Sequence, residues 1–402
     1  MRILWVNTHF LHPPTRGGQI RTLEMLRIMH RRHEIHYVGL LDERSTAESV
    51  PLSTQYCTRA YPIEHHLPRR ASFSFSVQAV GNLFSSLPLA VARYRSPEAL
   101  RTVAGLLNRQ RFDRVVCDFL FSVPNIPALE QAILFQHNVE TTIWRRHLAT
   151  ASDPFRRVFF RQQAARMEAY ESDVCRRMSH VIAVSAADSE RMRSMFQISH
   201  VSDIPTGVDI QYFCPPDPSP APATDFVFMG SMDWLPNIDG ASWFAEEILP
   251  LIRRRRPEAS LVIVGRKPTR KTLELASRDP RIKVTGTVAD IRPHLWSSSV
   301  AVVPLRIGGG TRLKIFEAMA ARVPVVSTAV GAEGLPVSHG TDILIADSPQ
   351  DFADRCLDLL ANPELGRGIV DRAWQMISTR FSWESVTSCF ERILEQAPAV
   401  SG

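Results

Sequence analysis

The chain has 402 residues, enough for two domains of ordinary size. With 45% hydrophobic and 22% charged residues it has ample apolar material for a core, which excludes a disordered, collagen-like or disulfide-scaffold protein. Its 47 Lys and Arg against 41 Asp and Glu leave a formal net charge of +6. Composition therefore predicts a globular protein and leaves open how its two domains are related.

The basic excess is rich in arginine, with clusters at positions 31–32, 69–70, 145–146 and 253–256. Solvated helix faces are the simplest interpretation, and contact with an anionic membrane surface is the second. The clusters occur on separate elements, and no helix-turn-helix, RRM or zinc-finger pattern accompanies them. We therefore expect no nucleic-acid partner.

The six cysteines lie far apart and form no zinc-binding or C-x-x-C pattern, which is typical of a reduced, cytoplasmic protein. The opening residues MRILWVN are too short an apolar run for a secretory signal and are typical of a first strand. No run approaches the roughly 20 apolar residues of a membrane-spanning helix. The sequence thus predicts a chain that is neither exported nor membrane-spanning.

Strand and helix patterns alternate along the chain, which is typical of an α/β fold. In the first half we expect helices at 19–31, 98–108 and 155–178, and strands at 2–6, 35–40, 114–117, 132–136, 181–184 and 201–204. The proline-rich stretch CPPDPSPAPA, which begins at Cys214, is typical of a linker.

After this stretch the pattern restarts. Strands are expected at 226–229, 261–264, 282–284, 300–303, 324–327 and 343–345, and helices at 240–256, 312–321, 349–360, 363–379 and 382–395. The predicted organisation is a doubly wound domain over 1–205, a linker over 206–224, a second doubly wound domain over 225–380 and a final helical segment over 381–402.

Glycine-bearing loops follow several of the predicted strands. They contain Gly17, Gly18, Gly230, Gly265 and the triplet 308–310. Ligands of open parallel sheets bind at the carboxyl ends of the strands, where a glycine lets the backbone approach a ligand closely. A tight turn explains each single glycine equally well. No loop matches the P-loop pattern, and no strand runs into G-x-G-x-x-G.

The most specific segment is VPLRIGGGTRLKIFEAMA at 303–320. A strand ends at Pro304, three glycines follow, and a helix begins near Thr311, which is a fair N-cap. Arg312 and Lys314 fall in its first turn, where cations oppose the helix dipole. Their placement is favourable if a diphosphate binds there.

Glu317 lies about one and a half turns further along the same helix. A carboxylate there could accept both vicinal hydroxyls of a ribose, as the acidic residue of dinucleotide-binding folds does. An amphipathic helix with its charges facing solvent is the alternative interpretation.

The segment GGGTRLKIFEAMA, with VPVVST and VGAEG after it, resembles the donor-site segment of the retaining GT-B glycosyltransferases of the bacterial group 1, or GT4-type, family. Other stretches are similar to this family too: the loop from Pro13 to Gly18 with Arg21, HNVE at 137–140, IPTGVD at 204–209 and GSMDWLPN at 230–237. The last of these is similar to relatives that assemble surface polysaccharides. The resemblance covers nearly the whole chain and is most specific over 304–335.

This resemblance implies two Rossmann-like domains that face each other across a cleft. The second domain would bind a nucleotide-sugar and the first an acceptor, and the helical segment over 381–402 would cross back to the first domain. By the same resemblance, Glu317 would bind the ribose, and Val288 would line the base. Arg312 and Lys314 would bind the diphosphate. The sugar and the phosphates would contact Gly309, Gly310, Thr311 and Leu313. His137 would face the transferred sugar, with Gly17 and Gly18 nearby.

Two departures from the family pattern bear on the donor. The family often has a Glu-x7-Glu pair, and Gly309 stands where its first carboxylate would be. Many relatives carry an Arg and a Lys in the loop that corresponds to 230–237, which has no cation here. Arg312 and Lys314 would then have to neutralise the negative charge of the diphosphate, with Arg306 as a further option.

The resulting hypothesis is a retaining hexosyltransferase that uses a UDP-, GDP- or ADP-sugar and a glycan or lipid-linked acceptor, in cell-surface polysaccharide or glycolipid synthesis. No Asp-x-Asp occurs, so we expect neither a metal nor a cofactor. His137 would position the donor, polarise the acceptor or be a structural histidine. A GT-B nucleotide-sugar epimerase and a non-catalytic nucleotide-sugar-binding subunit are the alternatives.

The acceptor cannot be named from the sequence. The stretch 67–94 mixes arginines at 69–70 with aromatic and aliphatic residues, so it could rest on a membrane. A lid or an ordinary packed excursion is equally compatible with it. The expected location is the cytoplasm, with the inner face of the cytoplasmic membrane as an option.

Overall fold

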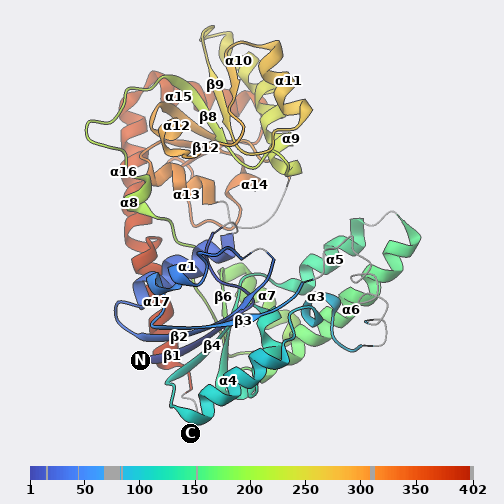
Figure 1. Cartoon of the computed structure of the whole chain (residues 1–402). Helices are drawn as coiled ribbons and strands as arrows, with labels where there is room; N and C mark the ends of the chain where they lie inside the picture. Colours follow the sequence, from blue (N-terminus) through green and yellow to red (C-terminus); the bar gives the residue numbers. More distant parts are fainter. Residues whose placement is uncertain are drawn as a thin grey trace. The chain divides into compact units, whose positions relative to one another are not determined.

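The computed structural model describes residues 1–14, 17–43, 45–67, 82, 85–150, 153–307 and 313–398. The chain divides into two compact units (Figure 1). One contains Met1–Pro205 and Val386–Gly402, and the other contains Thr206–Ser385.

The first unit is built on a parallel sheet whose described strands run in the order β3-β2-β1-β4-β5-β6-β7. Its strands are β1 (Arg2–Asn7), β2 (Glu34–Leu41), β3 (Arg59–Glu64), β4 (Arg114–Asp118), β5 (Ala132–Gln136), β6 (His180–Ala183) and β7 (Val201–Asp203). Its helices are α1 (Gly17–Met29), α3 (Leu89–Ala92), α4 (Pro97–Arg109), α5 (Glu140–Thr150), α6 (Pro154–Arg177), α7 (Ala186–Phe196) and most of α17 (Trp383–Gln396).

The second unit is built on a parallel sheet in the order β10-β9-β8-β11-β12-β13. Its strands are β8 (Thr224–Met229), β9 (Leu261–Val264), β10 (Ile282–Val284), β11 (Ser298–Val303), β12 (Val325–Ser327) and β13 (Leu344–Ile345). Its helices are α8 (Ile210–Phe213), α9 (Leu235–Trp243), α10 (Leu249–Arg253), α11 (Arg270–Arg278), α12 (Arg292–Trp296), α13 (Leu313–Ala320), α14 (Ala329–Ala332), α15 (Pro349–Ala361) and α16 (Pro363–Arg380).

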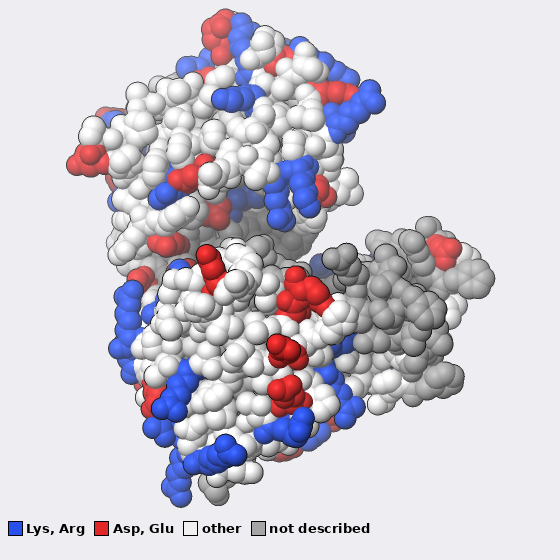
Figure 2. All heavy atoms as spheres, viewed as in Figure 1, with Lys and Arg blue, Asp and Glu red and all other residues white. Residues whose placement is uncertain are grey.

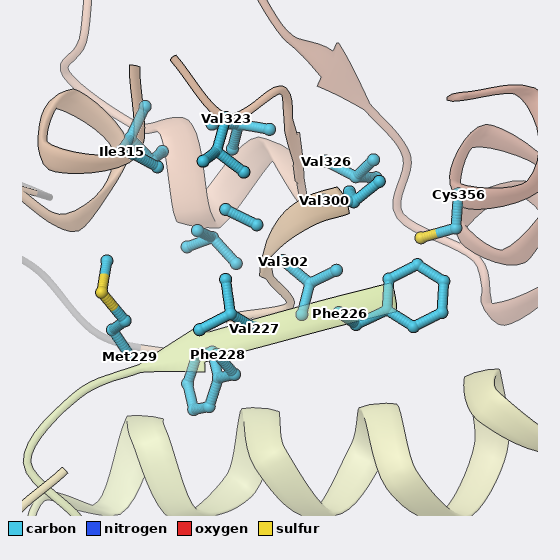
Figure 3. Packing of buried hydrophobic residues seen from close by; sticks show 14 of the residues in the cluster. Phe226, Val227, Phe228, Met229, Val300, Val302, Ile315, Val323, Val326 and Cys356 are labelled. Carbon is cyan, nitrogen blue, oxygen red and sulfur yellow. The ribbon is translucent and has the colours of Figure 1, made fainter. Parts of the chain in front are cut away.

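The central strands are apolar on both faces, as parallel strands covered by helices on each side require. In β1, Leu4 and Val6 join one core with Val103 of α4, whereas Trp5 points the other way and packs on Phe390 of α17 at 5.7 Å between ring centroids. In β8, Val227 and Phe228 leave the strand on opposite sides (Figure 3). Both sheets therefore have two covered faces, which confirms the predicted pair of Rossmann-like domains.

The structure differs from the predicted elements in several places, among them the helices α5, α7, α11 and α12, which were not predicted. The predicted linker 206–224 belongs to the second unit and contains the short helix α8. The helix expected at 240–256 begins earlier, as α9 at Leu235, and continues through a π-helical turn at Phe244–Ile248 into α10. The strand β3 had no signal, because it is an edge strand that contains Pro62 and is largely exposed.

Most of the arginine clusters make ion pairs. Arg32 pairs with Glu391 at 3.1 Å, Arg145 with Glu168 at 2.8 Å and Arg256 with Asp225 at 2.9 Å. Figure 2 shows Lys and Arg in separate groups with acidic side chains between them on the face in view. These contacts support the interpretation as solvated helix faces. Within the described ranges, no helix has the length and apolar character needed to cross a membrane.

Candidate functional site

A pocket of about 490 Å³ opens at the carboxyl ends of β8 and β9 in the second unit. The strand order of this sheet reverses between β8 and β11, so the pocket lies beside the switch point where open α/β sheets bind ligands. Its lining residues are Met229, Gly230, Ser231, Trp234, Asn237, Val264, Gly265, Arg266, Thr287, Val288, Ile291, Leu313, Lys314 and Glu317.

Six predicted site residues line this pocket: Gly230, Gly265, Val288, Leu313, Lys314 and Glu317. The structure therefore brings together segments that are up to about ninety residues apart in the chain. Four further predicted residues, Gly309, Gly310, Thr311 and Arg312, lie outside the described residues.

The two glycines of the pocket lie where two loops meet. A Cβ on Gly265 would lie 1.7 Å from the carbonyl oxygen of Gly230, and a Cβ on Gly230 would lie 2.5 Å from Nδ2 of Asn237. Because the clash at Gly265 is with backbone, this position requires glycine, whereas a side chain on Gly230 would displace the side chain of Asn237. The backbones of the loops after β8 and β9 are therefore in contact with each other, and residues of both loops line the pocket.

Lys314 reaches across the pocket from the first turn of α13. Its Nζ donates to Oδ1 of Asn237 at 2.7 Å and lies 4.7 Å from the ring centroid of Phe228. Asn237 is buried and donates from Nδ2 to the carbonyl oxygen of Ser231 at 2.9 Å. These contacts fix the ammonium group at the wall formed by the loop after β8.

Glu317 lies one turn further along α13 and is partly buried. Burial raises the pKa of its carboxyl to about 7, although the charge of Lys314 opposes this shift. The carboxyl is thus near its midpoint of ionisation at neutral pH, which suits a group that gains hydrogen-bond donors from a ligand.

Another part of the pocket lining is more apolar. Val288 and Ile291 are partly buried residues that pack against the core, and Thr287 lies beside them. This side has the character of a slot for a flat group such as a base.

Arg306, an option for phosphate charge, does not line the pocket. Its guanidinium bonds the carboxylate of Asp239 at 3.1 and 2.7 Å and lies 5.3 Å from the ring of Trp243. Arg266 lines the pocket instead, because it directly follows Gly265 at the end of β9. Among the described residues, no group of three or more His, Cys, Asp and Glu side chains could hold a metal ion.

A second cluster lies in the first unit, around His137 at the end of β5. Its Nε2 lies 2.7 Å from Oδ1 of Asp118, the last residue of β4. The other oxygen of this fully buried carboxylate accepts from Trp5 Nε1 at 3.0 Å, Asn7 Nδ2 at 2.6 Å and Thr22 Oγ1 at 2.9 Å. Four donors from β1, α1 and β5 therefore converge on one carboxylate.

Both ring nitrogens of His137 have partners. Its Nδ1 lies 3.1 Å from a guanidinium nitrogen of Arg21, which can only donate, so Nδ1 accepts and Nε2 carries the proton donated to Asp118. Burial lowers the pKa of His137, with Asp118 acting in the opposite direction, so a neutral ring agrees with this pattern. Burial also lowers the pKa of Arg21, to about 10, which leaves it charged at neutral pH.

Aromatic packing holds the His137 ring in place. The ring stacks on Phe119 with 4.3 Å between centroids and 5° between planes. A Cβ on Gly18 would lie 3.2 Å from Nδ1 of His137 and 3.0 Å from Phe119, so the structure brings Gly18 to this cluster. At Gly17, no heavy atom of the described residues outside its chain neighbours lies within 4 Å of an added Cβ.

The HNVE segment leads directly into α5, whose first turn is capped by a residue of α6. The buried carboxylate of Glu171 accepts from the backbone nitrogens of Glu140 at 2.9 Å and Thr141 at 2.7 Å. Burial raises the pKa of Glu140 to about 8, and the charge of Glu171 adds to the shift. This cap fixes the direction in which the chain leaves His137.

The stretch 67–94 lies partly outside the described residues, at 68–81 and 83–84. Its end packs in the first unit: Leu89 and Val91 of α3 are buried, and the backbone nitrogen of Leu89 donates to Oε1 of Gln163 at 2.8 Å. For Leu89 and Val91, the alternative of an ordinary segment packed on the domain is therefore correct.

Sequence reasoning missed Asp118, Asn237 and Arg266. Asp118 is the last residue of β4 and follows the apolar run VVC. Arg266 is the second residue after β9, whose sequence is LVIV. Their positions at the carboxyl ends of strands could have indicated a role in the site. Asn237 had no such signal, because its importance arises from contacts with residues 6 and 77 positions away.

Residues 223–362 match the family described as Glycosyl transferases group 1. A Klebsiella pneumoniae protein described as an uncharacterized 44.6 kDa protein in the cps region is 20% identical over 400 residues, which are 96% of this chain and 98% of that protein. The GDP-mannose-dependent alpha-(1-6)-phosphatidylinositol monomannoside mannosyltransferase of Mycobacterium tuberculosis is 30% identical over 156 residues, which are 35% of this chain and 40% of that enzyme.

Solved structures resemble the whole chain. The sucrose-phosphate synthase of Thermosynechococcus elongatus has a TM-score of 0.67 at 16% identity and covers 98% of both chains. Anabaena HepE in complex with UDP has a TM-score of 0.64 at 14% identity and covers 98% of this chain and 100% of that one. At such identities the likeness shows the fold alone, which is GT-B. The match to the family Glycosyl transferases group 1 covers residues 223–362, which lie in the second unit.

Proposed function

We propose that the chain is a retaining glycosyltransferase that transfers a hexose from a nucleotide-diphosphate sugar to a glycan or lipid-linked acceptor. The observation that carries the proposal is the pocket beside the switch point, where Lys314 and Glu317 from one helix meet the glycine-lined ends of β8 and β9. The resemblance of the 303–320 segment supports retention. The relative in a cps region supports a role in surface polysaccharide.

In this proposal, the nucleotide occupies the pocket of the second unit. The ribose hydroxyls donate to the carboxylate of Glu317, the base lies against Val288 and Ile291, and the diphosphate lies near Lys314. UDP is bound in Anabaena HepE, whereas the mycobacterial relative is named for GDP-mannose. UDP- and GDP-sugars are therefore the first donors to test, with ADP-sugars next.

Transfer requires that negative charge on the departing diphosphate be stabilised. Preorganised donors do this best, because they need no rearrangement as the charge develops. Lys314 and Arg312, together with the amino end of α13, would supply this positive charge from the protein itself. We propose on this ground a transfer that needs neither a metal ion nor a cofactor.

We assign His137 a positioning role. Asp118 and Arg21 occupy its two ring nitrogens and fix it as the neutral Nε2–H tautomer, so it is poorly placed to take a proton from an acceptor. Its buried ring, held against Phe119, would act by keeping the end of β5 and the loop around Gly18 in a fixed position. At Gly17, the lack of described heavy atoms near an added Cβ is compatible with a ligand close to the backbone.

The test of this function separates it from the two alternatives. Purified protein is incubated with UDP-, GDP- and ADP-hexoses, with and without octyl glycosides and polyprenyl diphosphate sugars as acceptors. Release of nucleoside diphosphate only in the presence of an acceptor, with the anomeric configuration kept in the product, supports retaining transfer. Formation of an epimer without release would establish an epimerase, and binding without either reaction would establish a binding subunit.

A peripheral contact with an anionic membrane, on the cytoplasmic side, is a second part of the proposal. The described surface that supports it is the helical hairpin of α5 and α6, where Arg157 and Arg161 are exposed and flank Val158, itself 68% exposed. An apolar residue between arginines on one helix face is typical of an interfacial segment.

Co-sedimentation with vesicles tests this contact. Phosphatidylglycerol vesicles are expected to retain the wild-type chain better than phosphatidylcholine vesicles. Changing Arg157 and Arg161 to Glu should abolish this preference, whereas the same change at Arg254 and Arg255 of the second unit alters net charge equally and should preserve most of it. Equal loss in both variants would show a non-specific charge effect.

A further inference from the structure

A bound nucleoside diphosphate brings two to three negative charges to the pocket of the second unit. The loop that follows β8, residues 230–237, supplies no cation and contains Asp233 instead. Arg306 is occupied by Asp239. Among the described residues that line the pocket, the cationic side chains are Lys314 and Arg266.

Arg266 is tied to the same loop as Lys314. Its Nε donates to Oγ of Ser231 at 2.9 Å, while Lys314 reaches the carbonyl oxygen of Ser231 through the side chain of Asn237. One loop residue therefore anchors both cations, one through its hydroxyl and the other through its backbone. This shared anchor places the two positive charges along one wall of the pocket.

The backbone of Arg266 is hydrogen-bonded to the loop after β8 as well. The backbone nitrogen of Met232 donates to the carbonyl oxygen of Arg266 at 2.9 Å, and the backbone nitrogen of Gly230 donates to that of Val264 at 2.9 Å. The bond from Nε to Ser231 leaves the two terminal nitrogens of the guanidinium without a hydrogen bond to any described residue. These nitrogens form the planar fork that suits a phosphate.

We propose that Arg266 is a further cation of the diphosphate subsite, in addition to Lys314 and Arg312, and that the loop after β9 supplies it in place of the loop after β8. This inference rests on the proposed function, because it assumes that the pocket binds a nucleoside diphosphate. Arg266 is distinct from its neighbour Lys267, which does not line the pocket and whose Nζ lies 3.6 Å from Asp233.

The proposal predicts an effect that depends on the phosphates. In Arg266→Ala, affinity for UDP or GDP should fall about tenfold or more, because a charge-assisted bond to phosphate is lost, whereas affinity for uridine or guanosine should not change. Ser231→Ala should cause a smaller loss in the same direction, since the guanidinium keeps its charge but loses its anchor. Lys267→Ala removes an equal charge one residue away and should stay within about twofold of wild type.

Isothermal titration calorimetry of the four proteins with uridine, UMP and UDP, and with the guanosine series, measures these affinities. A loss in Arg266→Ala that grows with the number of phosphates supports the inference. An equal loss for nucleoside and diphosphate would make Arg266 a contact of the base and overturn it, as would an unchanged affinity for both. If the wild-type chain binds no nucleoside diphosphate, the proposed function fails first, and this inference fails with it.

Discussion

The His137 cluster of the first unit and the pocket of the second unit contain similar chemical groups in opposite states. Around His137 the carboxylate, imidazole and guanidinium are buried and bond one another, so little hydrogen-bonding capacity is left for a ligand. In the pocket, Glu317 and Arg266 face open volume and are only partly engaged. The comparison teaches that the first cluster is built to be rigid, whereas the second is built to bind.

The largest expected effect is on stability, at Asp118. In Asp118→Ala, four donors lose their acceptor and the buried Arg21 guanidinium loses its counter-charge, which should cost about 3–5 kcal/mol of unfolding free energy. Urea unfolding monitored by tryptophan fluorescence measures this loss. Nucleotide binding by the second unit should survive at temperatures where the variant is folded. A variant as stable as wild type would show that the cluster is not the rigid element described here.

The next effect is on binding, at Glu317. Loss of its carboxylate in Glu317→Ala should weaken nucleoside diphosphate binding by about 1–3 kcal/mol, because the ribose hydroxyls lose a partly buried partner. Calorimetry measures the change, and Glu246→Ala is a control on an exposed carboxylate outside the pocket. Unchanged affinity in Glu317→Ala would remove the ribose role.

A smaller effect concerns pH. The Glu317 pKa of about 7 lies above the ordinary value of 4.5, so the folded chain holds this proton through the range in which the unfolded chain releases it. Its contribution to stability is therefore full below about pH 4.5 and is lost as pH rises towards 7. Nucleotide binding has the opposite dependence, because the ionised carboxylate accepts both hydroxyls. Affinity should rise roughly tenfold between pH 6 and 8.

The control for this pH effect is Glu317→Gln, since the phosphates of the ligand also titrate in this range. The difference between wild type and this variant isolates the carboxylate. Parallel pH profiles for the two proteins would contradict the assignment.

The smallest expected effect is at His137, whose imidazole should gain no second proton as the pH falls. Because burial lowers its pKa and Asp118 fixes its tautomer, the ring should stay neutral, with the proton on Nε2, from pH 8 to pH 6. Nitrogen-15 chemical shifts of the imidazole measure this state directly. A ring that becomes doubly protonated near its ordinary pKa of 6.5 would make His137 available for proton transfer and would weaken the positioning role.

The fold and part of the pocket could be predicted because their signals are local. Buried strands such as LVIV show as continuous apolar runs, and the 303–320 segment places Lys314 and Glu317 on one helix by spacing alone. The largely exposed edge strand β3 had no such signal. The roles of Asp118 and Arg266 depend on partners 113 and 35 residues away, which only the folded chain brings together.

The central claim is that the pocket beside the switch point of the second sheet binds a nucleoside diphosphate. A crystal structure of the chain with UDP or GDP, whichever binds more tightly in solution, tests it most directly. The account predicts ribose hydroxyls within hydrogen-bond distance of the Glu317 carboxylate and phosphate oxygens beside Lys314 and Arg266. A nucleotide bound elsewhere, or a ribose that does not contact Glu317, would contradict it.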